Sequence, residues 1–395
     1  MTPAPLPSSG EVANPSRLHA KLSGFYFVYY VAVGAFVPYW PLYLRGLGFA
    51  PEQIGALLAI PLITKVVAPN LWSWLGDWSG RRLGILRLGS LLAFLCFLGI
   101  FADDSLPWLV LVLAGYSFFW NAVLPQHEVI TLGFLGSRPE RYSRIRLWGS
   151  IGFIAAVVGV GFCFETWGIG WFPVAGSLLL ATILASSLTI PRPAAGVRER
   201  HWQPLHVAAR QPAVLAFLAA GLLLQVAHGA YYSFISIHLE ALGYSRSAIG
   251  VLWSVGVVAE ILVFVVMHRV LLRFGVRTVL LASLLLAALR WWLIGNWSHS
   301  LWLLVAAQSL HAFSFGTFHA AGIETIRRLF GPGAQGGGQA LYGAVSFGLG
   351  GAIGSWLAGR FWHLGATLVF DVAALACVVA ALIAWYGFRD RRLRD

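Results

Sequence analysis

The chain contains two copies of one sequence pattern, separated by a constant offset of 195 positions. Residues 34–82 align with residues 229–277 without a gap. The matched pairs include Gly34 with Gly229, Phe36 with Tyr231, Leu44 with Leu239, Gly48 with Gly243, Phe49 with Tyr244, Gly55 with Gly250, Gly80 with Gly275 and Arg82 with Arg277. A repeat of this length predicts a molecule built from two related halves.

The same register places Lys65 opposite Glu260. Both are ionisable residues inside long apolar stretches. Two homologous halves that each carry a charge at an equivalent depth are typical of transporters built around a central cavity. We therefore expect the two residues to lie at an equivalent depth in the two halves.

The composition requires lipid as the solvent. Hydrophobic residues make up 58% of the 395 positions and charged residues only 11%, whereas soluble domains carry about 25% charged residues. A spanning helix needs about 20 apolar residues. Twelve such segments are predicted, at 22–44, 52–75, 83–102, 107–130, 145–166, 171–190, 213–239, 247–268, 278–296, 301–326, 338–359 and 364–387.

The net charge of +12 comes from residues between the apolar segments. Loops on one side of the predicted membrane carry most of the arginines, and those on the other side carry only Arg45, Arg246 and Arg360. The positive-inside rule then places both termini in the cytoplasm. The basic excess reflects topology, so nucleic acid is not an expected partner.

The chain divides into five regions. The Pro- and Ser-rich start lacks an apolar core and is predicted to be a disordered cytoplasmic tail, not a cleaved signal. A Pro- and Arg-rich stretch reads as a linker between two six-helix bundles. The predicted boundaries are 1–20 for the tail, 21–190 and 213–388 for the bundles, 191–212 for the linker and 389–395 for a basic C-terminal tail.

A short basic loop follows the second segment. It reads Leu-Gly-Asp-Trp-Ser-Gly-Arg-Arg over residues 75–82. Asp77, Gly80, Arg81 and Arg82 match the loop signature of the major facilitator superfamily, which this segment resembles. The resemblance implies a latch that holds the two halves in one state. A glycine at such a turn allows two helices to reverse tightly.

Further segments extend the resemblance over nearly the whole chain. Residues 34–44 are similar to the first helix of the lactose permease group, and more similar to phenylpropionic acid transporter-like members of the superfamily. The stretches 68–72, 146–153, 228–232 and 310–315 resemble the same group. The resemblance implies an all-α fold of twelve transmembrane helices in two pseudo-symmetric bundles.

Glu260 lies in the middle of the eighth segment. A charge at the bilayer centre costs at least ~2.5 kcal/mol, so such a residue is a functional candidate. A carboxyl group shielded from water keeps its proton more readily, which suits a proton carrier. Glu260 resembles the sugar-binding carboxylate of the lactose permease group. The alternative is a structural ion pair with Lys65 or Arg290.

Glu128 and Arg146 end the fourth segment and begin the fifth. In type and spacing they resemble a substrate-binding ion pair of the lactose permease group. Both also lie close to the predicted cytoplasmic face, where a solvated charge costs little. Either a binding pair or two solvated charges would fit.

His311 lies in the tenth segment and resembles a histidine that lactose permease pairs with a carboxylate three positions on. That position is Ser314 here. The coupling carboxylate is therefore missing, and the sugar symporter's full proton mechanism does not carry over. His319 and Phe315 share a helical face with His311. An imidazole can carry the proton or bind an anion, so both histidines are candidates for proton coupling.

Three cations outnumber the two acids of the predicted cavity. Lys65, Arg146 and Arg290 face Glu128 and Glu260. This excess favours an anionic substrate such as a carboxylate. The alternative is that one cation neutralises each acid and the third reaches the membrane surface.

Polar and aromatic residues of the repeat could complete the binding site. Gln225 and His228 could hydrogen-bond a substrate, and Tyr39 and Tyr231 could stack on a ring. Packing is the simpler role for the aromatic residues. Asp371, in the last segment, either pairs with another group or forms a second proton site.

Several kinds of site are not expected. Cys96, Cys163 and Cys377 are far apart and show no metal or disulfide spacing. The glycine run 336–338 follows no strand and precedes no lysine, so a phosphate loop is not predicted. We expect no metal, no cofactor other than a proton gradient, and no enzyme activity.

The resulting hypothesis is a monomeric, proton-coupled symporter of a small organic carboxylate, with aromatic acids among the candidates, that works by alternating access in a bacterial inner membrane. A proton-coupled sugar or nucleoside symporter and a drug/proton antiporter remain alternatives, because the fold does not fix substrate or direction.

Overall fold

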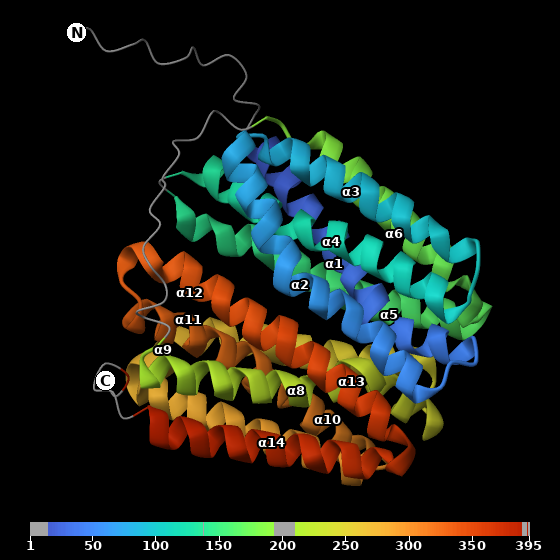
Figure 1. The fold of residues 1–395 in the computed structure, drawn as a ribbon, viewed down its shortest axis with the longest axis vertical. Coiled ribbons are helices and arrows are strands. Elements are labelled where there is room, and N and C mark those ends of the chain that lie inside the picture. The colour runs from blue at the N-terminus through green and yellow to red at the C-terminus, as the bar shows by residue number, and fades with distance from the viewer. Residues whose placement is uncertain (1–14, 137, 193–209, 389–392, 394–395) are drawn as a thin grey trace, which may run out of the picture.

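The structure is a computed structural model that describes residues 15–136, 138–192, 210–388 and 393. Over these residues every regular element is helical and no strand occurs. Helices α1 to α6 lie together on one side of the molecule and α8 to α14 on the other (Figure 1). We call these two groups the N-terminal and C-terminal halves.

The N-terminal half contains six long helices joined by short turns. Their bounds are α1 (Pro15–Gly46), α2 (Pro51–Ser79), α3 (Arg82–Leu98) with the 3₁₀ turn Gly99–Phe101, α4 (Leu106–Leu135), α5 (Tyr142–Trp167) and α6 (Phe172–Thr189).

The C-terminal half contains long helices that are interrupted in three places. Its elements are α8 (Pro212–Ala241), α9 (Arg246–Trp297), α10 (Leu301–Ser309), the π-helical stretch η4 (Ala312–Thr317), α11 (Phe318–Leu329), α12 (Gln335–Tyr342), the π-helical stretch η6 (Gly343–Gly350), α13 (Gly351–Phe361) and α14 (Ala366–Gly387). The chain runs from α10 through η4 into α11, and from α12 through η6 into α13, as two continuous rods.

The first helix begins earlier than the sequence predicts. α1 starts at Pro15, so the last residues of the predicted tail 1–20 are helical. A proline fits the first turn of a helix because its missing N–H has no partner there in any case. The remainder of that tail, most of the linker 191–212 and most of the segment 389–395 lie outside the described residues.

Eleven helices in the described ranges are long and apolar enough to cross a membrane. One of them, α9, has 52 residues and covers both the eighth and ninth predicted segments. A straight helix of 52 residues would be about 78 Å long, more than twice the ~30 Å of a bilayer core, but α9 is two helices joined at a break. Its helical geometry breaks at Gly275, which has φ of 73° and ψ of 159°.

The internal repeat is visible in the backbone of the turns. Gly48 and Gly243 have φ of 88° and 87°, and Gly80 and Gly275 have φ of 66° and 73°. Residues with a Cβ rarely adopt these angles. Each pair is related by the 195-residue offset, so the two halves reverse direction at equivalent places.

The halves meet where α2 packs on α13 and where α5 packs on α9. Glycines let the backbones approach closely in both contacts. A Cβ added at Gly55 of α2 would lie 2.6 Å from the Ser355 carbonyl oxygen of α13. Its repeat equivalent, Gly250 of α9, is pressed in the same way against the Val157 carbonyl of α5.

The outer surface of the helices is apolar. Large side chains such as Val265, Leu272 and Trp302 are more than 70% exposed. An exposed apolar surface of this extent is stable only in contact with lipid, where the helical backbone satisfies its own hydrogen bonds.

Candidate functional site

The N-terminal part of the site is a cluster of tyrosines around Arg146 of α5. Its Nη2 donates a hydrogen bond of 2.6 Å to the Tyr30 hydroxyl. The guanidinium also lies over the Tyr30 ring, 4.3 Å from the centroid, and 5.8 Å from the Tyr26 ring. Arg146 is therefore held between two aromatic faces of α1 by a hydrogen bond and cation–π contacts.

Glu128 of α4 belongs to the same cluster but does not form the expected direct ion pair with Arg146. Its Oε1 accepts a hydrogen bond of 3.1 Å from the Tyr142 hydroxyl, which lies 3.1 Å from the Tyr26 hydroxyl. The tyrosines occupy the space between acid and base, so the two charges interact without touching. The sequence alone does not single out Tyr142, because it stands at the loop end of α5.

Lys65 of α2 is exposed and faces the other half. Its Nζ lies 5.7 Å from the ring centroid of Phe347, in η6 of the C-terminal half. It is also near enough to Glu128 and to His319 for their charges to interact. Lys65 thus lies between the halves but does not pair with its repeat equivalent, Glu260.

Glu260 of α9 faces His311, at the junction of α10 and η4. Its Oε2 lies 3.6 Å from His311 Nε2, which is within the range of a charge interaction and too long for a hydrogen bond. Neither Lys65 nor Arg290, the two partners considered from the sequence, lies within ion-pair distance of it among the described residues. Gly316 packs against Glu260: a Cβ there would lie 2.8 Å from Glu260 Cγ.

The predicted face of His311, Phe315 and His319 is present. The His311 and Phe315 rings are stacked at 5.3 Å, and the Phe315 and His319 rings at 6.5 Å. His319 then stacks on Tyr342, at 6.0 Å. The intervening turn is π-helical, a distortion that is frequent at functional sites.

Arg290 of α9 lies deeper in the C-terminal half and is completely buried. Its Nη1 donates to Ser314 Oγ at 3.0 Å and its Nη2 to Gln308 Oε1 at 3.4 Å. The guanidinium carbon lies 4.2 Å from the Tyr231 ring centroid and 4.4 Å from that of Trp291. Burying an ion costs several kcal/mol, whereas a desolvated cation–π contact returns about 2 kcal/mol. The aromatic rings therefore offset only part of the cost.

The other predicted binding residues of α8 are packed around Arg290 or near it. Tyr231 donates a hydrogen bond of 2.9 Å to Gln308 Oε1. His228 is buried, with Nδ1 2.8 Å from the Leu224 carbonyl oxygen, and its ring meets Trp291 edge-on. Gln225 is buried beside Gly350 of η6. Gln308 was not among the predicted residues, although an amide inside an apolar segment is a usable signal.

Tyr39 has a different place. Its hydroxyl donates to the Val157 carbonyl oxygen at 2.6 Å and lies 3.3 Å from that of Arg246. It therefore braces α1 against α5 and α9 at the end of the molecule away from Asp77, and it is fully buried. These contacts favour packing over substrate binding.

Asp77 and Arg82 of the loop make side-chain contacts within the N-terminal half. Asp77 forms an ion pair with Arg82, whose Nη1 also donates to Gln126 Oε1 of α4 at 3.1 Å. Gly80 ends α2 with a left-handed conformation, and Arg81 precedes α3. In this conformation the predicted latch ties α2, α3 and α4 together.

The opposite ends of these helices carry charge contacts that join the halves. Arg45 of α1 and Arg246 of α9 both pair with Glu240 of α8. Glu165 Oε2 at the end of α5 accepts a hydrogen bond of 2.6 Å from the Arg246 backbone N–H. From the sequence these residues look like solvated loop charges.

One further such contact links α2 and α13. Arg360 lies 2.5 Å from Glu52. This contact and the Glu165 contact to α9 lie at the ends of α13 and α5, each of which packs against the other half.

Asp371 of α14 is half-buried near the start of its helix, not deep in the bundle. Its Oδ1 accepts a hydrogen bond of 2.8 Å from Asn296 at the far end of α9. The contact assigns Asp371 a partner, one of the two roles expected of it.

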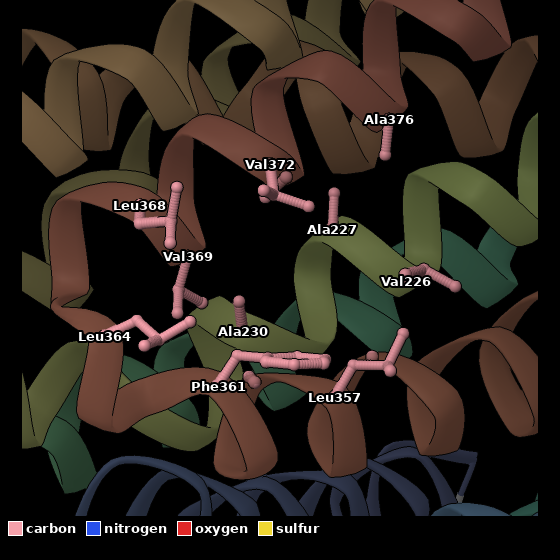
Figure 2. Close-up of a pocket in the computed structure, with 13 residues that line it drawn as sticks. Val226, Ala227, Ala230, Leu357, Phe361, Leu364, Leu368, Val369, Val372 and Ala376 are labelled. Carbon is pink, nitrogen blue, oxygen red and sulfur yellow. The ribbon is translucent and has the colours of Figure 1, made fainter.

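An apolar groove lies between α8, α13 and α14 (Figure 2). Its volume is about 290 Å³, and alanine, leucine, valine and phenylalanine side chains such as Ala230, Phe361 and Leu368 line it. The groove holds no ionisable group and is separate from the charged cluster. It can accommodate hydrocarbon, but it offers nothing to bind a proton or a carboxylate.

The comparisons with known proteins agree with this geometry. The sequence model of the MFS_1 like family matches residues 19–372. The chain belongs to this family. It is a member of the major facilitator superfamily, whose proteins are transporters and not enzymes.

Relatives of this MFS_1-like chain are named as transporters of different kinds of substrate. The probable 3-phenylpropionic acid transporter of Escherichia coli is 32% identical, over 91% of this chain and 95% of the relative. The maltose permease of Geobacillus stearothermophilus is 27% identical, over 91% and 92%. The chain is accordingly an integral membrane transporter.

Solved structures show the same fold. The crystal structure of the nucleoside transporter NupG superposes with a TM-score of 0.81 over 95% of this chain and 100% of that one, at 19% identity. At that identity the likeness concerns the fold alone.

Proposed function

We propose that this protein is a proton-coupled symporter of a small organic carboxylate, and that an aromatic acid is its substrate. The charge balance between the halves carries the proposal. Lys65, Arg146 and Arg290 outnumber Glu128 and Glu260, so a singly charged anion would balance the group. The relative named for 3-phenylpropionic acid supports an aromatic body on that anion.

The aromatic residues next to Arg146 and Lys65 provide a surface for such a body. Tyr26, Tyr30 and Phe347 lie beside the two cations. A carboxylate bound to Arg146 or Lys65 would leave its ring within reach of these faces, where aromatic pairs contribute about 0.5–1.5 kcal/mol beyond area burial.

Glu260 and His311 are the proposed proton site. The Glu260 side chain is 19% exposed, so a proton can reach it, and the buried His311 lies directly behind it. Only 3.6 Å separates the carboxylate from the imidazole, so a proton bound by one group changes the electrostatic interaction with the other. His319, stacked on the same aromatic row, is a second carrier in this proposal.

Alternating access follows from the distribution of contacts between the halves. Ion pairs join the halves at the ends of α1, α8 and α13, whereas the contacts of Asp77 and Arg82 lie within one half. We assign this conformation as inward-facing. We propose a monomer in a bacterial inner membrane, with α9 crossing twice to make twelve spans. The distribution of arginines supports a cytoplasmic position for the latch side and both termini.

Proteoliposomes with a trapped pH indicator test the proposal. Addition of 3-phenylpropionate outside should acidify the lumen faster than in protein-free liposomes, which report passive entry of the weak acid. Glu260→Gln should abolish the difference. If the variant acidifies the lumen as fast as wild type, the proton assignment is wrong.

A sugar or nucleoside symporter is the second candidate. Relatives named for maltose and for nucleosides support it, and the partly exposed Glu128 and Glu260 could accept hydrogen bonds from hydroxyl groups. Acidification driven by maltose or uridine, and not by the aromatic acid, would favour it.

A further inference from the structure

Arg290 is a buried cation without an acidic partner. It is fully enclosed, and no carboxylate of the described residues lies within 4 Å of its guanidinium. An arginine keeps its charge at all pH values at which a protein is folded. The structure therefore holds a positive charge that its own acidic side chains leave unbalanced.

The neutral groups around Arg290 add hydrogen-bond donors and few acceptors. Gln308 Oε1 already accepts from both Tyr231 and Arg290. The Nε of Arg290 and the Nε2 of Gln308 are buried and have no hydrogen-bond partner. A cation with two unsatisfied donors in one group is the complement of an anion, because an anion accepts several hydrogen bonds at once.

Ser314 stands where a carboxylate would complete the group. Its hydroxyl accepts the Arg290 Nη1 hydrogen bond at 3.0 Å and donates to the His311 carbonyl oxygen at 3.3 Å. A hydroxyl supplies an acceptor atom but no charge. The negative charge must then come from outside the chain.

We propose that Arg290, Gln308 and Ser314 form an anion-binding site in the C-terminal half that takes one monovalent anion, a carboxylate or a halide. With a carboxylate, this site rests on the proposed function and adds a second, deeper place for the acid group of the substrate, in addition to Arg146 and Lys65. With chloride, it stands independently of that function. His311 contacts Glu260 on one side and accepts the Ser314 hydrogen bond through its carbonyl on the other, and η4, which contains Ser314, is the π-helical stretch that must shift to admit the anion.

Thermal unfolding of the purified full chain tests the site. Ionic strength is kept constant with sodium isethionate, a bulky sulfonate, while chloride or 3-phenylpropionate replaces it stepwise. A bound ligand raises the unfolding midpoint in a saturable way. We expect saturation with at least one of the two anions for wild type, and loss of that response in Arg290→Gln.

Two matched variants keep the test independent of whether Arg290→Gln folds. Ser314→Asp places a carboxylate beside Arg290 and should raise the midpoint in isethionate and remove the response to added anion. Ser314→Asn has the same size without the charge and should not raise the midpoint. A rise with Asn equal to that with Asp would overturn the proposal, as would a wild type that responds to neither anion.

The outcomes also separate this site from the proposed function. Saturation by chloride alone identifies an inorganic anion site, which stands even if the liposome assay shows no carboxylate uptake. Saturation by 3-phenylpropionate alone identifies the acid group of the substrate. Proton-coupled uptake that survives in Ser314→Asp would overturn the carboxylate assignment and leave the symport proposal intact.

Discussion

Arg45 and Glu240 occupy equivalent positions in the two repeats, 195 residues apart, and form an ion pair with each other. Two equivalent residues that touch must lie on the axis that relates the halves. This axis therefore passes through the end of the molecule where α1 and α8 meet. Arg246 adds a second cation to Glu240, so this carboxylate is the centre of the contact between the halves.

Glu240→Gln should favour the conformation in which this end is open. Only the Arg45 pair crosses between the halves. It is partly exposed, and such pairs contribute about 1 kcal/mol or less. Its loss should shift the equilibrium between conformations by up to about fivefold. Double electron–electron resonance can measure the distance between spin labels at Trp167 and Leu364, after the three native cysteines are replaced. We expect this distance to lengthen in the variant.

The matched control for this shift is Glu324→Gln. Glu324 pairs with Arg327 and Arg328 inside α11 and joins no other helix through these contacts. Equal lengthening in the two variants would show that Glu240 has no special role.

Gly250→Ala should disturb the same equilibrium by a steric route. A methyl group there would collide with the Val157 carbonyl of α5, and overpacking of this kind costs about 1–3 kcal/mol. The same spin labels should report an open end and the thermal midpoint should fall. Gly159→Ala, which meets nothing within 4 Å, is the control and should change neither.

Gly316→Ala should impair proton coupling without touching an ionisable group. Its methyl group would displace Glu260 from its position 3.6 Å from His311. We expect substrate-driven acidification to fall about tenfold, which corresponds to ~1.4 kcal/mol. Gly343→Ala, in the π-helical stretch η6 with open space around it, should retain wild-type rates. If Gly316→Ala acidifies the lumen at the wild-type rate, proton coupling does not depend on the position of Glu260 relative to His311.

Tyr30→Phe should weaken binding of an anionic substrate. The variant removes the hydrogen bond that orients Arg146, and hydrogen bonds to charged groups contribute about 1.5–3 kcal/mol. KM for 3-phenylpropionate uptake should rise about tenfold or more with kcat little changed. Tyr43→Phe removes a hydroxyl from the other end of α1 and serves as the control. A fall in kcat alone would place Tyr30 in the conformational step.

Hydropathy and the repeat are sufficient to predict the helices and their turns. The register matches Gly80 with Gly275, and both have a positive φ, 66° and 73°, at the turn where the chain reverses. Apolar length decides where a helix runs, since lipid leaves the backbone no other partner. The start of α1 at Pro15 is not predicted, because a polar first turn outside the bilayer carries no hydropathy signal.

The partners of the charged residues are harder to predict. The sequence offers Lys65 or Arg290 as the partner of Glu260, and the structure places His311 there instead. Spacing predicts a pair of Glu128 and Arg146. In the structure Glu128 instead accepts a hydrogen bond from Tyr142, and Arg146 donates one to Tyr30. A rotation of one helix by a fraction of a turn exchanges one partner for another. Sequence spacing places residues on a helix, and it does not fix that rotation.

The turns at Gly80 and Gly275 have a mechanical consequence. Consecutive Cα atoms are only about 3.8 Å apart, so a one- or two-residue connection allows the ends of two helices almost no separation. α2 and the part of α9 before Gly275 both lie at the contact between the halves. Each is joined by such a short connection to the next helix, which packs on the side away from the contact. A helix at the contact therefore tilts only by carrying its neighbour along. Each half must move as one body, and the work of any such movement falls on the few glycine and ion-pair contacts between them.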